Sequence, residues 1–311
     1  MNEIILHEVG MRDGLQVEKQ IVPTQTKILW IESLLESGVD IIQLGSFVHP
    51  EKMPQLADTD ELFRHFSEPG RRRRHTILSG LVLNEKGLDR GLACGVDQFC
   101  MGVSASDTHS RKNTGMSTPE ALHRILAIAK RALEAGKLVQ VSVQSAFGCG
   151  FEGPVPEDRV LSLVKQFLEA DLRTISLADT AGHANPWQVE QLYSKIFDLD
   201  PGIECACHFH DTYGLGMVNS FAAIQAGVKY FESAFGGLGG CPFTAVAGGN
   251  VCTEDFVHLL HRHGWREEVQ LQPFIELART ASTFFGRTLP GIVHRSGPIP
   301  AAQLQEPVET R

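Results

Sequence analysis

Two histidines lie two residues apart in the stretch ECACHFHDT, residues 204–212, which is typical of a short β-strand. In an extended chain alternate residues share a face, so His208 and His210 point together while Cys205 and Cys207 point the other way. This separation argues against a Cys/His zinc cluster. A lone histidine at such a position is more often a satisfied core residue. The pair predicts instead that both imidazoles bind one divalent cation.

Oxygen atoms from other parts of the chain should complete such a site. Asp13 and Asn250 both stand near the ends of apolar stretches and are placed for this role. Two neutral imidazoles with a carboxylate and an amide oxygen suit Mg²⁺ or Mn²⁺, although these ligand types also allow Zn²⁺ or Fe²⁺. The alternative for Asp13 is a cap on the loop before the first helix. The adjacent Arg12 weakens that alternative, because a helix N-terminus disfavours a nearby cation.

A second chemical signal is the glycine-rich stretch GGLGGCPFTAVAGGN, residues 236–250. Dense glycines let the backbone approach a ligand closely and let a loop move as a lid. Cys241 on this loop is either a thiol exposed to the ligand or a small buried hydrophobe, and spacing alone leaves both open. Cys252 starts the following helical pattern, and we interpret it as structural.

The elements that must position these residues form a repeating pattern. Segments 23–38 and 117–136 show apolar spacing near i, i+3, i+4 and end in a glycine, as amphipathic helices do. Eight alternating strand and helix units predict a parallel (β/α)8 barrel with an extra C-terminal helical segment. An open doubly wound sheet is the alternative, but its GxGxxG fingerprint is absent after the first strand. The strand-like runs lie within 3–10, 39–47, 75–83, 96–104, 138–148, 173–180, 204–212 and 230–240.

Barrel enzymes carry their chemistry at the C-terminal ends of the strands. Polar residues do gather at the ends of these runs: Glu8, Arg12, Asp13, Gln43, Ser46, Ser176, Asp179, His208, His210, Cys241 and Asn250. We expect residues 1–285 to form one catalytic barrel domain and residues 286–311 to form a C-terminal tail.

The composition excludes several classes of protein. A net charge of −9 argues against a nucleic-acid partner, and the basic run at residues 71–74 is interpreted as a solvated loop. No apolar run reaches the roughly 20 residues that cross a bilayer, and no leader pattern precedes the first strand, so we expect a soluble, cytoplasmic protein without a membrane partner. Seven scattered cysteines fit reduced thiols better than a disulfide framework.

Several long motifs resemble one family. They are EVGMRDGLQ, SFVHPEKMPQLAD, VSVQSAFGCGFEG, SLADTAG, HFHDTYGLGMVN and GLGGCPFTAVAGGNVCTED, and they occur in this order between about residues 3 and 262. The sequence is similar to the 3-hydroxy-3-methylglutaryl-CoA (HMG-CoA) lyases, within the metal-dependent barrel enzymes that make or break C–C bonds by Claisen chemistry. The GGCP loop and the HDTYG motif favour the lyases over the condensing enzymes of this group.

The resemblance implies roles for the residues already singled out. It implies that an acyl-CoA substrate is cleaved with a divalent cation, Mg²⁺ or Mn²⁺, bound by Asp13, His208, His210 and Asn250. Asp13 or His208 would assist removal of the hydroxyl proton, Arg12 would stabilise the enolate, and Cys241 would return a proton to it. The residues implied to line the substrate pocket are Glu8, Gln16, Gln43, Ser46, Ser176 and Asp179. Barrels of this kind often dimerise, so we expect a homodimer.

One stretch departs from the family pattern. The second strand reads IIQLGSF, with Gln43 where the family carries an acidic residue and Leu44 and Gly45 in place of two hydroxyl residues. An amide in place of a carboxylate removes a charge beside Arg12, and Gly45 is expected to free volume. Besides HMG-CoA, citramalyl-CoA is therefore a candidate substrate. A condensing enzyme and a non-catalytic thioester-binding barrel are the remaining alternatives.

Overall fold

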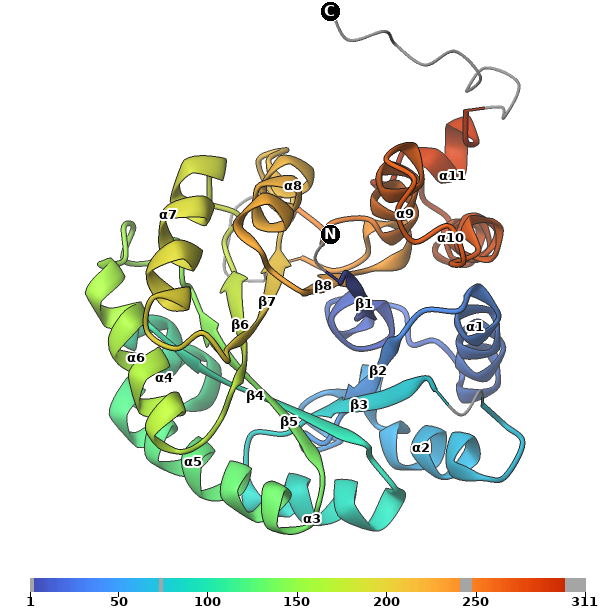
Figure 1. Ribbon diagram of the computed structural model, residues 1–311. Helices are drawn as coiled ribbons and strands as arrows, with labels where there is room; N and C mark the ends of the chain where they lie inside the picture. The colour runs from blue at the N-terminus through green and yellow to red at the C-terminus, as the bar shows by residue number, and fades with distance from the viewer. Residues whose placement is uncertain (1–2, 73–74, 241–247, 300–311) are drawn as a thin grey trace, which may run out of the picture.

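The computed structural model describes residues 3–72, 75–240 and 248–299, and its centre is a closed barrel of eight parallel strands. Figure 1 shows the strands as the inner ring and the helices around it. The strands are β1 (Ile5–Glu8), β2 (Ile41–Ser46), β3 (Ile77–Leu81), β4 (Gln98–Ser104), β5 (Leu138–Gln144), β6 (Thr174–Asp179), β7 (Glu204–Phe209) and β8 (Tyr230–Ser233). Each lies within one of the eight predicted runs, so the predicted (β/α)8 barrel is confirmed.

The barrel closes between its first and last strands. Ile5 of β1 pairs with Tyr230 of β8, and the parallel register continues to Glu8 opposite Ser233. Because every strand runs in the same direction, all eight C-terminal ends meet at one rim. The polar residues predicted at the strand ends therefore lie together at one end of the barrel, where barrel enzymes have their active sites.

The helices follow the strands in turn and cover the outside of the barrel. Their apolar faces, such as Ile31 and Leu34 in the first helix, are buried. No helix in the described ranges has the length and apolar character that a membrane span needs. The helices are α1 (Thr24–Ser37), α2 (Thr59–Ser67), α3 (Glu85–Cys94), α4 (Asp107–Thr114), α5 (Thr118–Glu134), α6 (Glu157–Glu169), α7 (Pro186–Phe197), α8 (Gly216–Ala226), α9 (Thr253–Arg262), α10 (Leu271–Phe285) and α11 (Val293–Ser296).

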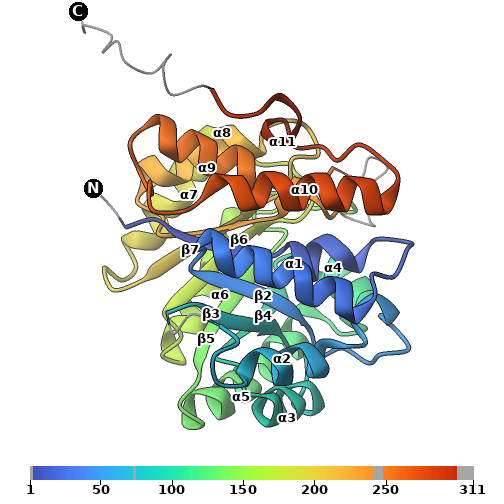
Figure 2. The same ribbon diagram turned by 90° about the vertical axis from the view of Figure 1, so that its right-hand side faces the viewer.

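The extra C-terminal helical segment packs against the start of the chain. Figure 2 shows α10 lying along α1, and the two helices are in contact. Trp30 of α1 meets the rings of Phe284 and Phe285 edge-on, with both centroid distances near 6 Å (5.7 and 6.1 Å). After α10, the short helix α11 buries His294 against Glu254 of α9, with Nδ1 3.0 Å from the carboxylate. The last helices thus fix the same side of the barrel as the first one.

Candidate active site

A π-helical turn at the end of β1 carries two of the predicted site residues, Arg12 and Asp13. Residues Gly10–Gly14 form this turn, and the amides of Arg12 and Asp13 both donate to the carbonyl of Val9, at 3.0 and 2.7 Å. Single π-turns are rare and occur frequently at functional sites. The wide turn places an arginine and an aspartate side by side at the barrel rim.

The two histidines of the β7 end converge on this aspartate. His208 and His210 lie with their Nε2 atoms 3.1 Å apart, and each Nε2 is 3.9 Å from Oδ2 of Asp13. All three side chains are buried. Cys207 lies on the opposite face of β7 within the hydrophobic core, as the strand alternation predicts. Among the residues that the structure describes, this is the only cluster of three acidic, His or Cys ligands able to hold a metal ion.

Asn250 completes the cluster from the segment that follows β8. Its backbone forms a bridge with His210, and its Nδ2 donates to Asp13 Oδ2 at 2.8 Å and to the carbonyl of Leu238 at 2.9 Å. The side-chain oxygen Oδ1 is buried and has no hydrogen-bond partner. A buried acceptor without a donor is costly, and a cation would satisfy it.

The donor set therefore fits a divalent cation. The ligand atoms of Asp13, His208 and His210 all lie within 4.8 Å of one another, and the free oxygen of Asn250 belongs to a residue bonded to that aspartate. Carboxylate, amide oxygen and imidazole together suit a cation of intermediate hardness. This geometry supports the predicted divalent site.

The charges in this cluster follow from burial and close neighbours. Although burial favours the neutral acid, the Arg12 guanidinium and the imidazoles hold the pKa of Asp13 well below its usual range. Burial lowers the pKa of His210 to about 4, so this imidazole is neutral. Burial also opposes a charge on His208, but contact with Glu232 outweighs it and raises that pKa. An ionised carboxylate and a neutral imidazole are the forms that bind metals.

Two amide side chains surround the Arg12–Asp13 pair. The guanidinium of Arg12 donates through Nε to Oε1 of Gln43 and through Nη1 to Oδ1 of Asp13. Gln16 donates its side-chain amide to the same Asp13 oxygen at 2.8 Å. Only 12% of the Arg12 side chain is exposed. The guanidinium is thus held in place beside the cluster and has a neutral partner on β2.

The expectation that Gly45 frees pocket volume is wrong. A Cβ at this position would lie 2.3 Å from the hydroxyl oxygen of Thr59 in α2, so the space is already filled. The β2–β3 register shifts between Gln43 and Gly45, and the glycine lets the irregular strand approach α2. Ser46, one residue on, donates its backbone amide to Thr59, and its own hydroxyl is buried without a partner.

Two of the residues expected in the substrate pocket bind backbone groups instead of facing the histidines. Glu8 is fully buried and accepts from the amides of Gly10 and Phe235 and from the Thr253 hydroxyl. Asp179 accepts from two amides of the loop that leads to α7. Both carboxylates shape the loops at the rim, and their contact with substrate stays a prediction.

Ser176 contacts Glu232, a buried residue that was not among the predicted site residues. Its hydroxyl donates to Glu232 of β8 at 3.0 Å, inside the barrel. The other carboxylate oxygen of Glu232 lies 3.0 Å from Nδ1 of His208. The signal was present in the sequence, since Glu232 is the one charged residue within the otherwise uncharged β8 stretch YFES.

The cysteines fall into two groups. Cys241 lies outside the described residues, so its expected place beside the substrate stays a prediction. Cys252 precedes α9, is buried and has a pKa raised well above its usual range by burial, which agrees with a structural role. The six cysteines in the described ranges are all free thiols.

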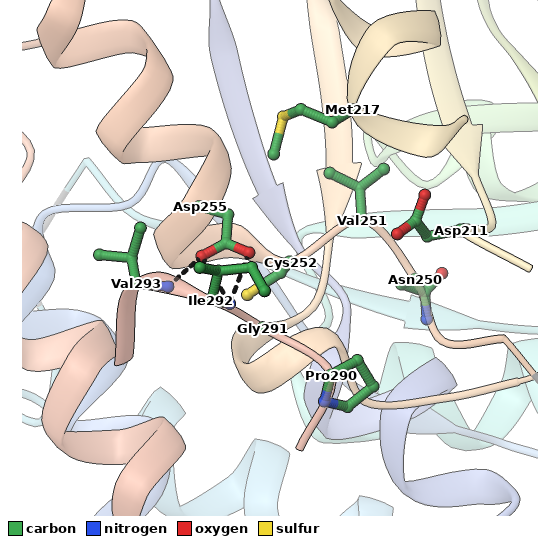
Figure 3. Close-up of a pocket in the computed structure, with 10 residues that line it drawn as sticks. All are labelled: Asp211, Met217, Asn250, Val251, Cys252, Asp255, Pro290, Gly291, Ile292 and Val293. Atoms are coloured by element: carbon green, nitrogen blue, oxygen red, sulfur yellow. Dashed lines mark hydrogen bonds between the residues drawn. The ribbon is translucent and has the colours of Figure 1, made fainter. Parts of the chain in front are cut away.

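A cavity of about 350 Å³ adjoins the cluster on the outer side of Asn250. Figure 3 shows its lining residues, which come from the loop after β7, from α8 and α9 and from the segment that leads into α11, with Asp255 bonded to the amides of Ile292 and Val293. Asp211 and Asp255 make its lining acidic, and neither histidine nor Arg12 lines it. Among the described residues, its lining contains no Lys or Arg that could bind the phosphate groups of a CoA thioester.

Comparisons with known proteins agree with this geometry. A family model described as HMGL-like matches residues 3–281. Hydroxymethylglutaryl-CoA lyase YngG of Bacillus subtilis is 35% identical over 288 residues, covering 93% of this chain and 95% of the relative. The (R)-citramalyl-CoA lyase of Chloroflexus aurantiacus is 35% identical over 305 residues, 96% of both chains. The structure of an HMG-CoA lyase from Acinetobacter baumannii with coenzyme A and 3-methylmalate has a TM-score of 0.88 and 36% identity, covering 96% of this chain and 98% of that one.

Proposed function

The chain belongs to the HMGL-like family, and from this premise we propose that it is a divalent-metal-dependent carbon–carbon lyase that cleaves 3-hydroxy-3-methylglutaryl-CoA to acetyl-CoA and acetoacetate. The observation that carries the proposal is the meeting of Asp13, His208 and His210 beside Arg12 at the barrel rim. Relatives named hydroxymethylglutaryl-CoA lyase cover nearly the whole chain.

The metal in this proposal is Mg²⁺ or Mn²⁺, held by Asp13, His208, His210 and Asn250. The unpartnered oxygen of Asn250 supports the fourth ligand. When bound, such a cation supplies Lewis-acid polarisation of the substrate's hydroxyl and a neighbouring carbonyl oxygen.

The side chains of this protein would handle the proton and the developing charge. In the proposed reaction, Asp13 or His208 accepts the proton of the C3 hydroxyl as the C–C bond breaks and a thioester enolate leaves. Arg12, a permanent cation, lies beside this pair and stabilises the enolate oxygen. Cys241 then delivers a proton to the enolate carbon, which gives acetyl-CoA.

Citramalyl-CoA is a second candidate substrate because of Gln43. The amide oxygen of Gln43 accepts from Arg12, so the guanidinium has no carboxylate partner on β2. An amide in place of a carboxylate removes a negative charge beside the guanidinium and so changes the polarity of the pocket. One relative of comparable identity and greater coverage acts on (R)-citramalyl-CoA.

The proposal also includes partners and location. We propose an acyl-CoA substrate, a homodimer and a cytoplasmic location, without a nucleic-acid or membrane partner. Free thiols at six described cysteines support a reducing compartment. The net charge of −9 supports the absence of a nucleic-acid partner.

The experiment is acetyl-CoA release by wild-type protein and by Gln43→Glu, with HMG-CoA and with citramalyl-CoA, in Mg²⁺ or Mn²⁺. We expect wild type to cleave HMG-CoA faster, to lose activity in EDTA and to regain it when the cation is restored. Faster cleavage of citramalyl-CoA, reversed by Gln43→Glu, would establish the second candidate. Thioester binding without cleavage in either cation would refute both and favour the non-catalytic barrel.

A further inference from the structure

Glu232 is a buried carboxylate inside the barrel, directly behind one of the proposed metal ligands. Strand β8 places it level with His208 of β7 in the parallel register. Only 8% of the residue is exposed. A charge in such a place is expensive unless donors surround it, so its partners indicate what it does.

Two hydrogen-bond donors hold this carboxylate, one from β5 and one from β6, and an imidazole nitrogen of β7 lies close to it. Oε1 accepts from the Gln140 side-chain amide at 2.6 Å and from the Ser176 hydroxyl at 3.0 Å. Oε2 lies 3.0 Å from Nδ1 of His208. With Oε1 occupied by β5 and β6, Oε2 is directed at the histidine.

The two nitrogens of His208 therefore face different surroundings. Nδ1 faces the Glu232 carboxylate, while Nε2 faces His210 at 3.1 Å and Asp13 at 3.9 Å. A carboxylate only accepts hydrogen bonds, and the buried Nδ1 has no other partner, so this contact favours a proton on Nδ1. Nε2 of the neutral ring is then left with its lone pair directed toward the other ligands. Since neither nitrogen then remains to accept the substrate's hydroxyl proton, Asp13 is the proton acceptor of the two named above.

Building on the proposed function, we propose that Glu232 is a positioning residue that holds His208 in the Nδ1–H tautomer and in the ring orientation required for cation binding. Carboxylates that bind the second nitrogen of a ligating histidine fix its tautomer and direction in this way. The donors on Oε1 hold the carboxylate itself, so the arrangement reaches from β5 to β8.

The first test measures Mn²⁺ affinity by electron paramagnetic resonance of the free ion, without substrate. Glu232→Gln keeps the size of the side chain but loses the charge and one acceptor, and we expect affinity to fall by about 10- to 100-fold. Glu232→Asp keeps the carboxylate on a shorter stem, and its affinity should lie between those of Glu232→Gln and wild type.

Glu204→Gln is the matched control. Glu204 begins β7 at the other end of the barrel, where it binds Lys229 and Tyr230 at 2.7 and 2.8 Å. It lies on the same strand as His208 but contacts neither that histidine nor the other proposed ligands. Its Mn²⁺ affinity should match that of wild type.

The second test reads the tautomer directly in cation-free wild type, by long-range ¹H–¹⁵N NMR of labelled histidines at a pH where the imidazole is neutral. The signal is assigned by its loss in His208→Gln. We expect a proton on Nδ1, with the fraction falling in Glu232→Gln. This readout does not depend on whether Glu232→Gln folds, because the wild-type spectrum alone can contradict the proposal.

The outcomes separate this inference from the proposed function. A proton on Nε2 in wild type, or Mn²⁺ affinity within about twofold of wild type in folded Glu232→Gln, would overturn the role of Glu232 even in an active lyase. A wild-type protein that binds Mn²⁺ but cleaves no thioester would overturn the proposed function and leave the tautomer result standing.

Discussion

At the N-terminal end of the barrel, charged side chains pair one with another near the surface, whereas at the C-terminal rim they crowd together away from water. Asp40 before β2 binds Arg266 and the amide of Leu6, with a carboxylate side chain that is 32% exposed. Asp13 at the rim is buried between a guanidinium and two imidazoles. The first arrangement leaves each group satisfied.

The rim arrangement leaves a group unsatisfied, which is the difference that matters. The Asn250 oxygen has no partner, and two imidazole nitrogens face each other beside a carboxylate. Buried polar atoms without a protein partner indicate a site for a ligand, whereas ion pairs whose groups all have partners contribute to stability. The two ends should therefore respond to mutation in opposite ways, the rim through activity and the other end through stability.

The largest effect is expected at the rim, from Arg12→Gln. Loss of a donor to a developing oxyanion costs about 10²- to 10³-fold in kcat, and we expect this loss in acetyl-CoA release. Mn²⁺ affinity should survive, because the guanidinium is not a ligand. Arg131→Gln, at an exposed ion pair with Asp89 on the outside of the barrel, is the control and should be as active as wild type. An active Arg12→Gln would remove Arg12 from the proposed reaction.

At the opposite end, Asp40→Ala should act on stability alone. It leaves the Leu6 amide without its side-chain acceptor and removes one of the acceptors of the largely buried Arg266, which should lower the free energy of unfolding by about 1–3 kcal/mol. Urea denaturation measures this change, and kcat should stay at the wild-type value. Glu268→Ala removes the exposed carboxylate on the same arginine and should change stability by less than about 0.5 kcal/mol. A large loss of kcat in Asp40→Ala would contradict the prediction that the N-terminal end of the barrel affects stability and not activity.

The pH dependence of stability sharpens the comparison, since Glu8 lies at the rim but binds only backbone amides and a hydroxyl. Burial raises its pKa from 4.5 to about 8, so the native state binds more protons than the unfolded chain between these values. Stability should therefore fall as pH rises from about 5 to about 8, by up to about 1.4 kcal/mol per pH unit. Glu8→Gln should reduce this slope, measured by urea denaturation at several pH values. Equal slopes would show that Glu8 does not titrate in this range.

Much of the fold and part of the site could be predicted from sequence because they depend on local periodicity. Alternation along β7 was enough to bring His208 and His210 together and to send Cys207 away. The rule that strand ends meet at one rim brought Asp13 and Asn250 to the histidines. These inferences need only the direction of each strand.

What could not be predicted depends on register and on packing across the barrel. Glu232 was missed because its role appears only when β8 is aligned with β7 so that it lies beside His208. The volume expected at Gly45 was wrong because the irregular β2 brings Thr59 into that space. The amides that occupy Glu8 come partly from Phe235, more than 200 residues away. A single sequence does not contain these distances.

The position of the cluster at the β1–β8 junction has a consequence for biosynthesis. Asp13 and Asn250 are in contact although 237 residues separate them, so the site cannot assemble until almost the whole chain has left the ribosome. Contacts between such distant segments form late, because the intervening chain must first be ordered. A cation that binds only the closed ring stabilises it by an amount that rises with the logarithm of its concentration relative to Kd. Binding of a cellular divalent ion would thereby stabilise the newly made barrel and favour the pairing of β1 with β8 in the absence of substrate.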